Sequence, residues 1–305
     1  MQTNVDVKKI STESRNQNTK NIDLLTTKEM LQKINDEDKT VAYAVEKAID
    51  NIAKVVDKVV EQIENGGRLI YIGAGTSGRL GVLDAAECPP TYGVSTDTVI
   101  GLMAGGMKAT TFAVEGAEDR KDLAVQDLEN VKLTKNDVVI GIAASGRTPY
   151  VIGGIEYAKK VGAFTSCITT SAGSILASMV DVPIEAVTGA EVINGSTRMK
   201  SGTAQKLICN MISTTTFIKL GKVYENMMID LQATNEKLVA RALNIIVELT
   251  GYTKEEANDK LNEYKTVKKV LINYFTGCTD NVIIDKTLEN VHGNIRKAIK
   301  ELGEK

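Results

Sequence analysis

The stretch Arg68-Leu-Ile-Tyr-Ile-Gly-Ala-Gly-Thr-Ser-Gly-Arg79 decides the fold. Its first part, Arg68 to Ile72, is short and rich in β-branched and aromatic residues, and it follows the paired glycines Gly66 and Gly67, a pattern typical of a buried strand. Three glycines then allow a tight turn into a helix whose first amide N–H groups have no partner within that helix. Such a turn favours an anion as its ligand.

The same glycine spacing fits the dinucleotide-binding fingerprint, which is a weak motif when it stands alone. That fingerprint also requires a carboxylate about 20 residues later, at the end of the second strand. The candidate second strand, Asp97 to Ala104, ends without an acid, which disfavours a nicotinamide cofactor. Thr76 and Ser77 place two hydroxyls in the turn, and hydroxyls with amide N–H groups suit a phosphomonoester. A tight turn in which Thr76 and Ser77 only cap the helix stays open as an alternative.

A second turn of this kind follows the strand predicted over Asp137 to Ala144. It reads Ser145-Gly-Arg-Thr-Pro149 and leads into a helix with Pro149 in its first turn. Parallel strands end at one edge of their sheet, where open sheets bind ligands. A dinucleotide needs one such loop, whereas a phosphosugar needs one loop for its phosphate and another for its hydroxyls. The two loops together favour a sugar phosphate.

The order of the predicted elements indicates an α/β fold. Five strands alternate with helices, which predicts a doubly wound five-stranded parallel sheet followed by a small helical C-terminal appendage. The strands are expected at residues 68–72, 97–104, 137–144, 163–169 and 182–187. The predicted domains are an N-terminal arm and short helix at 1–39, a phosphosugar-binding domain at 40–235 and a helical subdomain at 236–305.

The helices are expected to have the following limits. A capping box of Thr26 and Glu29 starts a short helix that ends near residue 34. A long amphipathic helix over residues 41–66 is suited to packing on a sheet or on a second subunit. Pro89 and Pro90 are expected to end the helix after the first glycine turn near Ala86. Further helices are predicted at 203–220 and 225–249, and about three more beyond residue 251.

Composition excludes several classes of function. The 305 residues carry a net charge of −2 and only 4% aromatic residues, which disfavours a nucleic-acid surface. The single histidine and four scattered cysteines predict no metal site. The longest apolar run, Val138 to Ala144, is too short to cross a bilayer, and no apolar signal core stands at the N-terminus. We therefore expect a soluble cytoplasmic protein.

Two groups of carboxylates are candidates for chemistry. Glu87 falls in the last predicted turn of its helix, where the helix dipole disfavours a negative charge, so it is either tolerated in solvent or kept for a reaction. Glu115, Glu118 and Asp119 crowd before the next helix, where an acidic first turn is commonly stabilising. Because their segment leaves the carboxyl end of a strand, a role in the site is also open for them.

At these motifs the chain resembles the sugar isomerase (SIS) domain superfamily and, more narrowly, the N-acetylmuramic acid 6-phosphate etherase family. The resembling segments are Ile34–Thr40, Gly73–Gly81, Ala86–Gly93, Val114–Asp119, Ala144–Tyr150 and Gly195–Thr203. The last is similar to a signature that etherases share with glucokinase regulatory proteins. The segments reach to about Leu238, and the residues beyond Gly251 match less closely.

The resemblance implies cleavage of the lactyl ether of N-acetylmuramic acid 6-phosphate to N-acetylglucosamine 6-phosphate and D-lactate in cell-wall recycling. It implies a metal-independent lyase without a cofactor, and a homodimer with its site near the subunit interface. By position, Glu87 matches the family's catalytic acid and Glu118 its second catalytic carboxylate. The residues that fall on the sugar-phosphate-binding loops are Thr76, Ser77, Ser145, Gly146, Arg147 and Thr148.

The residue types agree with an elimination, which needs one group to take the proton on carbon 2 and another to protonate the departing oxygen. Our hypothesis is that Glu118 takes the proton and that Glu87, expected to be buried, protonates lactate. An unbroken helix from Ser77 would carry Glu87 roughly 15 Å away along its axis. Either that helix bends back, or Glu87 completes the site of a neighbouring subunit.

Two rival functions stay open at this point. A non-catalytic sugar-phosphate sensor of the glucokinase-regulator type would use both loops and bind without turnover. A sugar-phosphate isomerase could use Glu118 as its base but has no need for an acid at Glu87. The sequence also leaves open which basic side chain contacts the phosphate, and the candidates are Arg147, Arg198, Lys200 and Lys206.

Overall fold

The computed structural model describes residues 14–230 and 236–303, and these divide into two compact units. The first comprises the described residues up to Ala86 together with Thr96–Ser213, and the second comprises Glu87–Ser95 together with the described residues from Thr214 onward. The predicted domain limits at 1–39, 40–235 and 236–305 stay a prediction. Within the described residues, no helix is long and apolar enough to cross a membrane.

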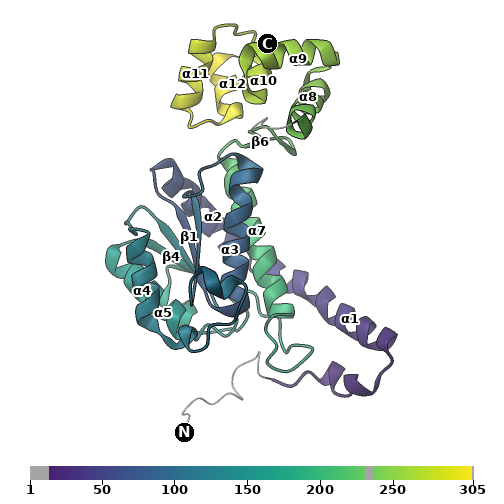
Figure 1. Cartoon of the computed structure of the whole chain (residues 1–305), viewed down its shortest axis with the longest axis vertical. Coiled ribbons are helices and arrows are strands. Elements are labelled where there is room, and N and C mark those ends of the chain that lie inside the picture. Colours follow the sequence, from purple (N-terminus) through teal and green to yellow (C-terminus); the bar gives the residue numbers. More distant parts are fainter. Residues whose placement is uncertain (1–13, 231–235, 304–305) are drawn as a thin grey trace. The chain divides into compact units, whose positions relative to one another are not determined.

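The first unit is built on five parallel strands in the order β2-β1-β3-β4-β5 (Figure 1). The strands are β1 (Leu69–Gly73), β2 (Val99–Met103), β3 (Val138–Ile142), β4 (Phe164–Thr169) and β5 (Val182–Glu185). Every residue of β1 and β3 is buried, as expected for strands that are covered on both faces. The predicted doubly wound α/β fold is thus confirmed.

Helices cover both faces of this sheet. The helices of the chain up to residue 219 are α1 (Thr27–Glu46), α2 (Ile49–Glu64), α3 (Gly75–Tyr92), α4 (Lys121–Asn130), α5 (Pro149–Val161), α6 (Ile175–Met179) and α7 (Lys200–Lys219). On one face, α4 and α5 share a buried apolar core with Ile70 and Ile72 of β1. On the other, α2 contacts β3 and β5, and α3 lies so close that a Cβ on Gly81 would come within 2.8 Å of Tyr71 Cβ.

Three of the helix limits predicted up to residue 92 are wrong. The capping box of Thr26 and Glu29 is present, but α1 continues to Glu46 instead of ending near residue 34, and α2 begins only at Ile49. Similarly, α3 does not end near Ala86 but continues through Pro89 and Pro90 to Tyr92.

The second unit is mainly helical, as predicted for the C-terminal part. Its further elements are the strand pair β6 (Val223–Tyr224) and β7 (Met227–Met228), and the helices α8 (Glu236–Thr250), α9 (Lys254–Tyr264), α10 (Val267–Thr276), α11 (Asn281–Asn290) and α12 (Ile295–Leu302). The predicted helix start at Glu225 is wrong, because Glu225 lies in the hairpin with a φ of 53°. Between Gly251 and residue 303, where the described part of the chain ends, four helices are present where about three were expected.

Candidate functional site

The two hydroxyl-bearing loops leave neighbouring strands of the sheet. Loop 73–77 follows β1 and loop 143–148 follows β3, and these strands are paired from Leu69 with Val138 to Gly73 with Ile142. On the other side of β1 lies β2, so the order of strands reverses direction between β1 and β3. Open parallel sheets bind ligands in the crevice at such a reversal.

Glycines shape the first loop. A Cβ on Gly73 would lie 2.7 Å from the amide nitrogen of Gly78, and one on Gly78 would lie 2.6 Å from Met103 Cβ. The backbone can therefore fold back on itself here only without side chains. As a result α3 begins at Gly75, directly after the strand, and Thr76 and Ser77 lie in its first turn.

The second loop starts α5. Thr148 is the N-cap residue of α5, its side chain makes no capping hydrogen bond, and Pro149 occupies the first turn. The first amide groups of a helix need partners, and an anion supplies them well. Gly146 is buried, has a φ of 63° and donates its N–H to the carbonyl of Ala143, which sets the loop's sharp bend.

A cavity of about 350 Å³ lies between the two loops. Five of the six residues predicted to bind the substrate line it, together with Glu118: Thr76, Ser77, Ser145, Arg147 and Thr148. The sixth, Gly146, shapes the loop without lining the cavity. Gly195 and Thr197 close the cavity from the segment that precedes α7.

Glu118 lies where this cavity meets a second one. The second cavity, of about 180 Å³, is also lined by Glu118, Ala74 and Gly75, and it adds Arg79 and Glu115 to apolar side chains. Glu118 comes from a short 3-10 turn, Ala117–Asp119, which follows Gly116 in the left-handed conformation. Its carboxylate is exposed and lies beside both spaces.

Glu87 lies differently from what was expected. It is exposed, and it is not among the residues that line either cavity. Because α3 is continuous from Gly75 to Tyr92, the first of the two alternatives, a helix that ends early and bends back, is excluded.

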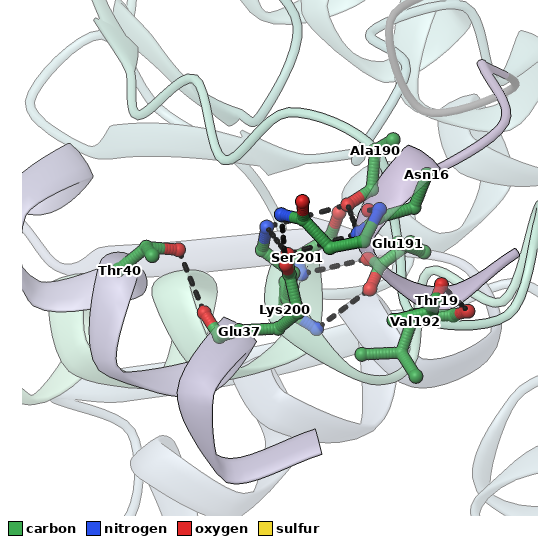
Figure 2. A network of polar contacts seen from close by, with 10 residues as sticks. Asn16, Thr19, Glu37, Thr40, Ala190, Glu191, Val192, Lys200 and Ser201 are labelled. Atoms are coloured by element: carbon green, nitrogen blue, oxygen red, sulfur yellow. Dashed lines mark hydrogen bonds and ion pairs between the residues drawn. The ribbon is translucent and has the colours of Figure 1, made fainter. Parts of the chain in front are cut away.

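The basic candidates separate clearly. Arg147 lines the larger cavity, whereas Arg198 and Lys206 are exposed and are not among its lining residues. Lys200 is buried, and its Nζ donates to Glu37 Oε2 at 2.8 Å (Figure 2). Lys200 is therefore committed to an ion pair inside the protein.

Figure 2 shows how this ion pair is embedded. Glu37 also accepts hydrogen bonds from the side-chain amides of Asn16 and Asn18, at 2.9 and 2.7 Å. Glu191 accepts from the backbone N–H groups of Lys200 and Ser201, at 2.8 and 2.9 Å. The carboxylate of Glu191 thus occupies the place of an anion at the N-terminus of α7. The candidate anion sites beside the cavity are therefore the starts of α3 and α5.

Gln205 is a further residue at the site, and no motif in the sequence indicates it. Its Oε1 accepts a hydrogen bond from Ser77 Oγ at 2.9 Å. Gln205 is on α7, 128 residues away in the chain, and no local pattern connects it with the first loop. Among the described residues, no group of three His, Cys, Asp or Glu side chains could hold a metal ion.

Known proteins resemble this chain along most of its length. Family models match for the glucokinase regulatory protein N-terminal SIS domain at residues 51–159, the SIS domain at 108–215 and the C-terminal lid domain of glucokinase regulatory protein at 225–276. Among solved structures, a candidate phosphosugar isomerase involved in capsule formation from Bacteroides fragilis NCTC 9343 matches with a TM-score of 0.50 and 24% identity. The match covers 65% of this chain and 94% of that one, and it supports the fold alone.

Two curated relatives cover nearly the whole chain. A protein of Clostridium botulinum (strain Okra / Type B1) named N-acetylmuramic acid 6-phosphate etherase is 54% identical over 300 residues, which are 98% of this chain and 99% of that protein. A protein of Bacillus cereus (strain AH820) with the same name is 52% identical over 95% of this chain and 99% of its own length. With this identity over matching lengths, the chain belongs to the N-acetylmuramic acid 6-phosphate etherase family of SIS-domain proteins.

Proposed function

We propose that this protein cleaves the D-lactyl ether of N-acetylmuramic acid 6-phosphate, giving N-acetylglucosamine 6-phosphate and D-lactate in the recycling of peptidoglycan amino sugars. The observation that carries the proposal is that Glu118 lines the same cavity as the hydroxyls of both loops. A phosphate held by the loops places the sugar beside a carboxylate. The family membership of the chain supports the same substrate.

In this proposal the phosphate binds between the starts of α3 and α5. Thr76, Ser77, Ser145 and Thr148 offer hydroxyls, and the two helices offer N–H groups that have no partner within the helix. Arg147 is the basic side chain that lines the cavity, and we assign it the contact with the phosphate. The ring-opened sugar then extends toward Glu118.

The reaction needs two proton transfers. Glu118 takes the proton from carbon 2, which the neighbouring aldehyde acidifies, and the electron pair forms the double bond between carbons 2 and 3 as the bond from carbon 3 to the lactyl oxygen breaks. Glu87 gives its proton to that oxygen. Water then adds at carbon 3 with Glu87 as base, and Glu118 returns the proton to carbon 2. Neither step requires a metal or an organic cofactor.

We propose further that the protein is a homodimer and that Glu87 acts in the partner's site. The apolar stripe of α2, which was expected to face either the sheet or a second subunit, is buried in its own chain. However, Leu31 and Tyr43 on α1 are 61% and 68% exposed, and they offer apolar surface for a second copy. An exposed Glu87 on a continuous α3 is consistent with that arrangement.

The test is to incubate the purified protein with N-acetylmuramic acid 6-phosphate in the presence of a chelator and to assay D-lactate. Release that is lost in E118Q and in E87Q supports the proposal. Tight binding of the sugar phosphate without lactate would indicate the sensor. Interconversion of sugar phosphates without lactate would indicate the isomerase.

A further inference from the structure

Gln205 makes one hydrogen bond into the site and leaves a second polar group unused. Its side chain is fully buried, and its Oε1 accepts a hydrogen bond from Ser77 Oγ, 2.9 Å away. Its Nε2 is buried too and has no hydrogen-bond partner among the described residues. Buried N–H groups without a partner are rare, more so than carbonyl oxygens with spare capacity. A buried N–H group without a partner is not what a residue that only fills the interior would have, so it points to a role for Gln205.

The direction of the Ser77 hydrogen bond matters for the ligand. A serine hydroxyl has one proton, and a phosphate dianion only accepts hydrogen bonds. While Ser77 donates to Gln205, it turns a lone pair toward the cavity, and a lone pair repels an anion. For Ser77 to bind phosphate, its proton must point into the cavity, and its oxygen can then accept a hydrogen bond from behind.

Rotation of the Gln205 amide by 180° supplies that hydrogen bond. Nε2 then faces Ser77 Oγ and donates a hydrogen bond to it. The buried N–H group thus gains a partner in the same state in which the Ser77 hydroxyl donates to the anion. The carbonyl oxygen takes the place of the amide nitrogen. Oxygen and nitrogen of a glutamine amide have nearly the same size, so the surrounding packing does not have to change.

The first turns of α7 hold Gln205 against the loops. A Cβ on Gly202 would meet Thr76 Cγ2 at 3.4 Å, which is ordinary van der Waals contact. Ser201 Oγ lies 2.9 Å from Thr170 Oγ1, which in turn donates to the carbonyl of Ala144 at 3.1 Å. The start of α7 therefore lies close to Thr76 of the first loop and is connected to Ala144 of the second through Thr170.

We infer that Gln205 is a positioning residue that sets the direction in which the Ser77 hydroxyl donates its hydrogen bond. In the empty site Gln205 accepts a hydrogen bond from Ser77, and when a phosphomonoester is bound it donates a hydrogen bond to Ser77 Oγ. The inference rests on the proposed function only in placing the substrate's phosphate beside Ser77. It predicts that Gln205 acts on phosphate affinity through Ser77 and has little effect on the proton transfers at carbons 2 and 3.

The experiment combines substitutions at both positions and measures the Kd for inorganic phosphate by calorimetry and kcat and KM for lactate release. Q205M keeps the side-chain length but cannot donate, so we expect phosphate affinity to fall and KM to rise about tenfold, with kcat within about twofold of wild type. Q205E is nearly isosteric, but its carboxylate can only accept hydrogen bonds and adds a negative charge, so phosphate affinity should fall further. In the S77A background, Q205M should have no further effect.

S213A is the matched control, because Ser213 is a buried hydrogen-bonding residue on the same helix that donates to Asp84. It should lower the melting temperature without changing phosphate affinity. Wild-type affinity in Q205M, or the same loss from Q205M with and without Ser77, would overturn the inference. If Q205M does not fold, Q205E decides: phosphate affinity equal to wild type would overturn it. Phosphate binding is measured without turnover, so a protein that releases no lactate would still test Gln205.

Discussion

The ammonium group of Lys200 lies 2.8 Å from Glu37 Oε2, and the two side chains are only 5% and 9% exposed. Glu37 belongs to α1, and Lys200 is the first residue of α7. The pair therefore ties the N-terminal helix to the segment that brings Gly195 and Thr197 to the larger cavity. Thr19, which donates to the carbonyl of Val192 at 2.8 Å, adds a second tie to the same segment (Figure 2).

Removing one member of this pair should destabilise the first unit strongly. In E37A the ammonium of Lys200 stays buried without its counter-ion, which costs about 3–5 kcal/mol of unfolding free energy. Urea unfolding followed by circular dichroism measures this loss. The control is D36A, which breaks the exposed i,i+3 pair of Asp36 and Lys39 and should cost less than about 0.5 kcal/mol. Similar losses in the two variants would contradict a structural role for the buried pair.

Because of the same pair, the free energy of unfolding should depend on pH at values below the ordinary pKa of a glutamate. Burial acts to raise the pKa of Glu37, but hydrogen bonds from Lys200, Asn18 and Asn16 outweigh it and lower the pKa below 4.5. Because the folded-state pKa is lowered, the stabilisation is present above the unfolded-state value and is lost as the pH falls through the folded-state value. The difference in unfolding free energy between wild type and E37Q should therefore shrink below pH 4.5. A constant difference would contradict this.

Asp84 should show the opposite dependence. Its carboxylate is 5% exposed and accepts hydrogen bonds from Tyr71, Asn210 and Ser213, at 3.0, 2.8 and 3.0 Å. Burial raises the pKa of Asp84 above 3.8 in spite of these donors. A raised folded-state pKa means that wild type loses stability as the pH rises from the unfolded-state value through the folded-state value.

D84N is the variant that isolates this effect. An asparagine here can accept from Asn210 and Ser213 and donate to the Tyr71 hydroxyl, so the hydrogen bonds can be kept while the charge is removed. Urea unfolding of both proteins from pH 4 to pH 7 should show that D84N gains stability relative to wild type as the pH rises. All other titrating groups are shared, so a difference that does not change with pH would rule out ionisation of Asp84 as the cause.

The sequence predicted the parts of the site that local chemistry determines. The two loops combine glycines and hydroxyls within a few residues of a buried strand, so both their conformation and their ligand class could be predicted. Gln205 and the pair of Glu37 and Lys200 could not, because each contact joins residues more than a hundred positions apart. A single sequence gives no sign of which distant polar groups meet.

The wrong helix limits have a physical reason as well. Pro89 and Pro90 cannot donate backbone hydrogen bonds, which predicts the end of a helix. However, packing in the second unit outweighs this preference: Tyr92 stacks on Phe217 at 4.6 Å between ring centroids, and its hydroxyl lies 3.2 Å from Thr214 Oγ1. At the hairpin, the apolar residues beside Glu225 fit a short strand as well as a helix, so periodicity could not decide between them.

Gly146 should be essential for the shape of loop 143–148, which we propose binds the phosphate. Its φ of 63° disfavours any other residue, and a Cβ would lie 2.3 Å from Ser174 Oγ. We expect G146A to raise KM for the sugar phosphate by about tenfold or more, because the loop must shift to relieve the clash. Steady-state kinetics of lactate release measures this.

The control is G173A, with a φ of 61° and no atom within 4 Å of the new Cβ. It should cost about 1–2 kcal/mol of stability and leave KM unchanged. Equal KM values in the two variants would contradict the assignment.

Hybrid dimers should reveal whether Glu87 acts in the partner's site. If it does, a dimer of one E87Q chain and one E118Q chain has one intact site, made of Glu118 from the first chain and Glu87 from the second. Random exchange makes half of the dimers hybrid, so lactate release should recover to about one quarter of wild type, although each variant alone is inactive. Native mass spectrometry verifies the exchange.

Wild type mixed with the E87Q/E118Q double variant gives the reciprocal test. If Glu87 acts across the interface, a wild-type chain in a hybrid loses the partner's Glu87, and equal mixing should reduce the activity per chain to about one quarter. If Glu87 acted within its own chain, that activity would fall only to about one half, and the two single variants would not complement each other. Verified exchange with that result would place Glu87 in its own chain's site and would contradict the proposal that it acts in the partner's site.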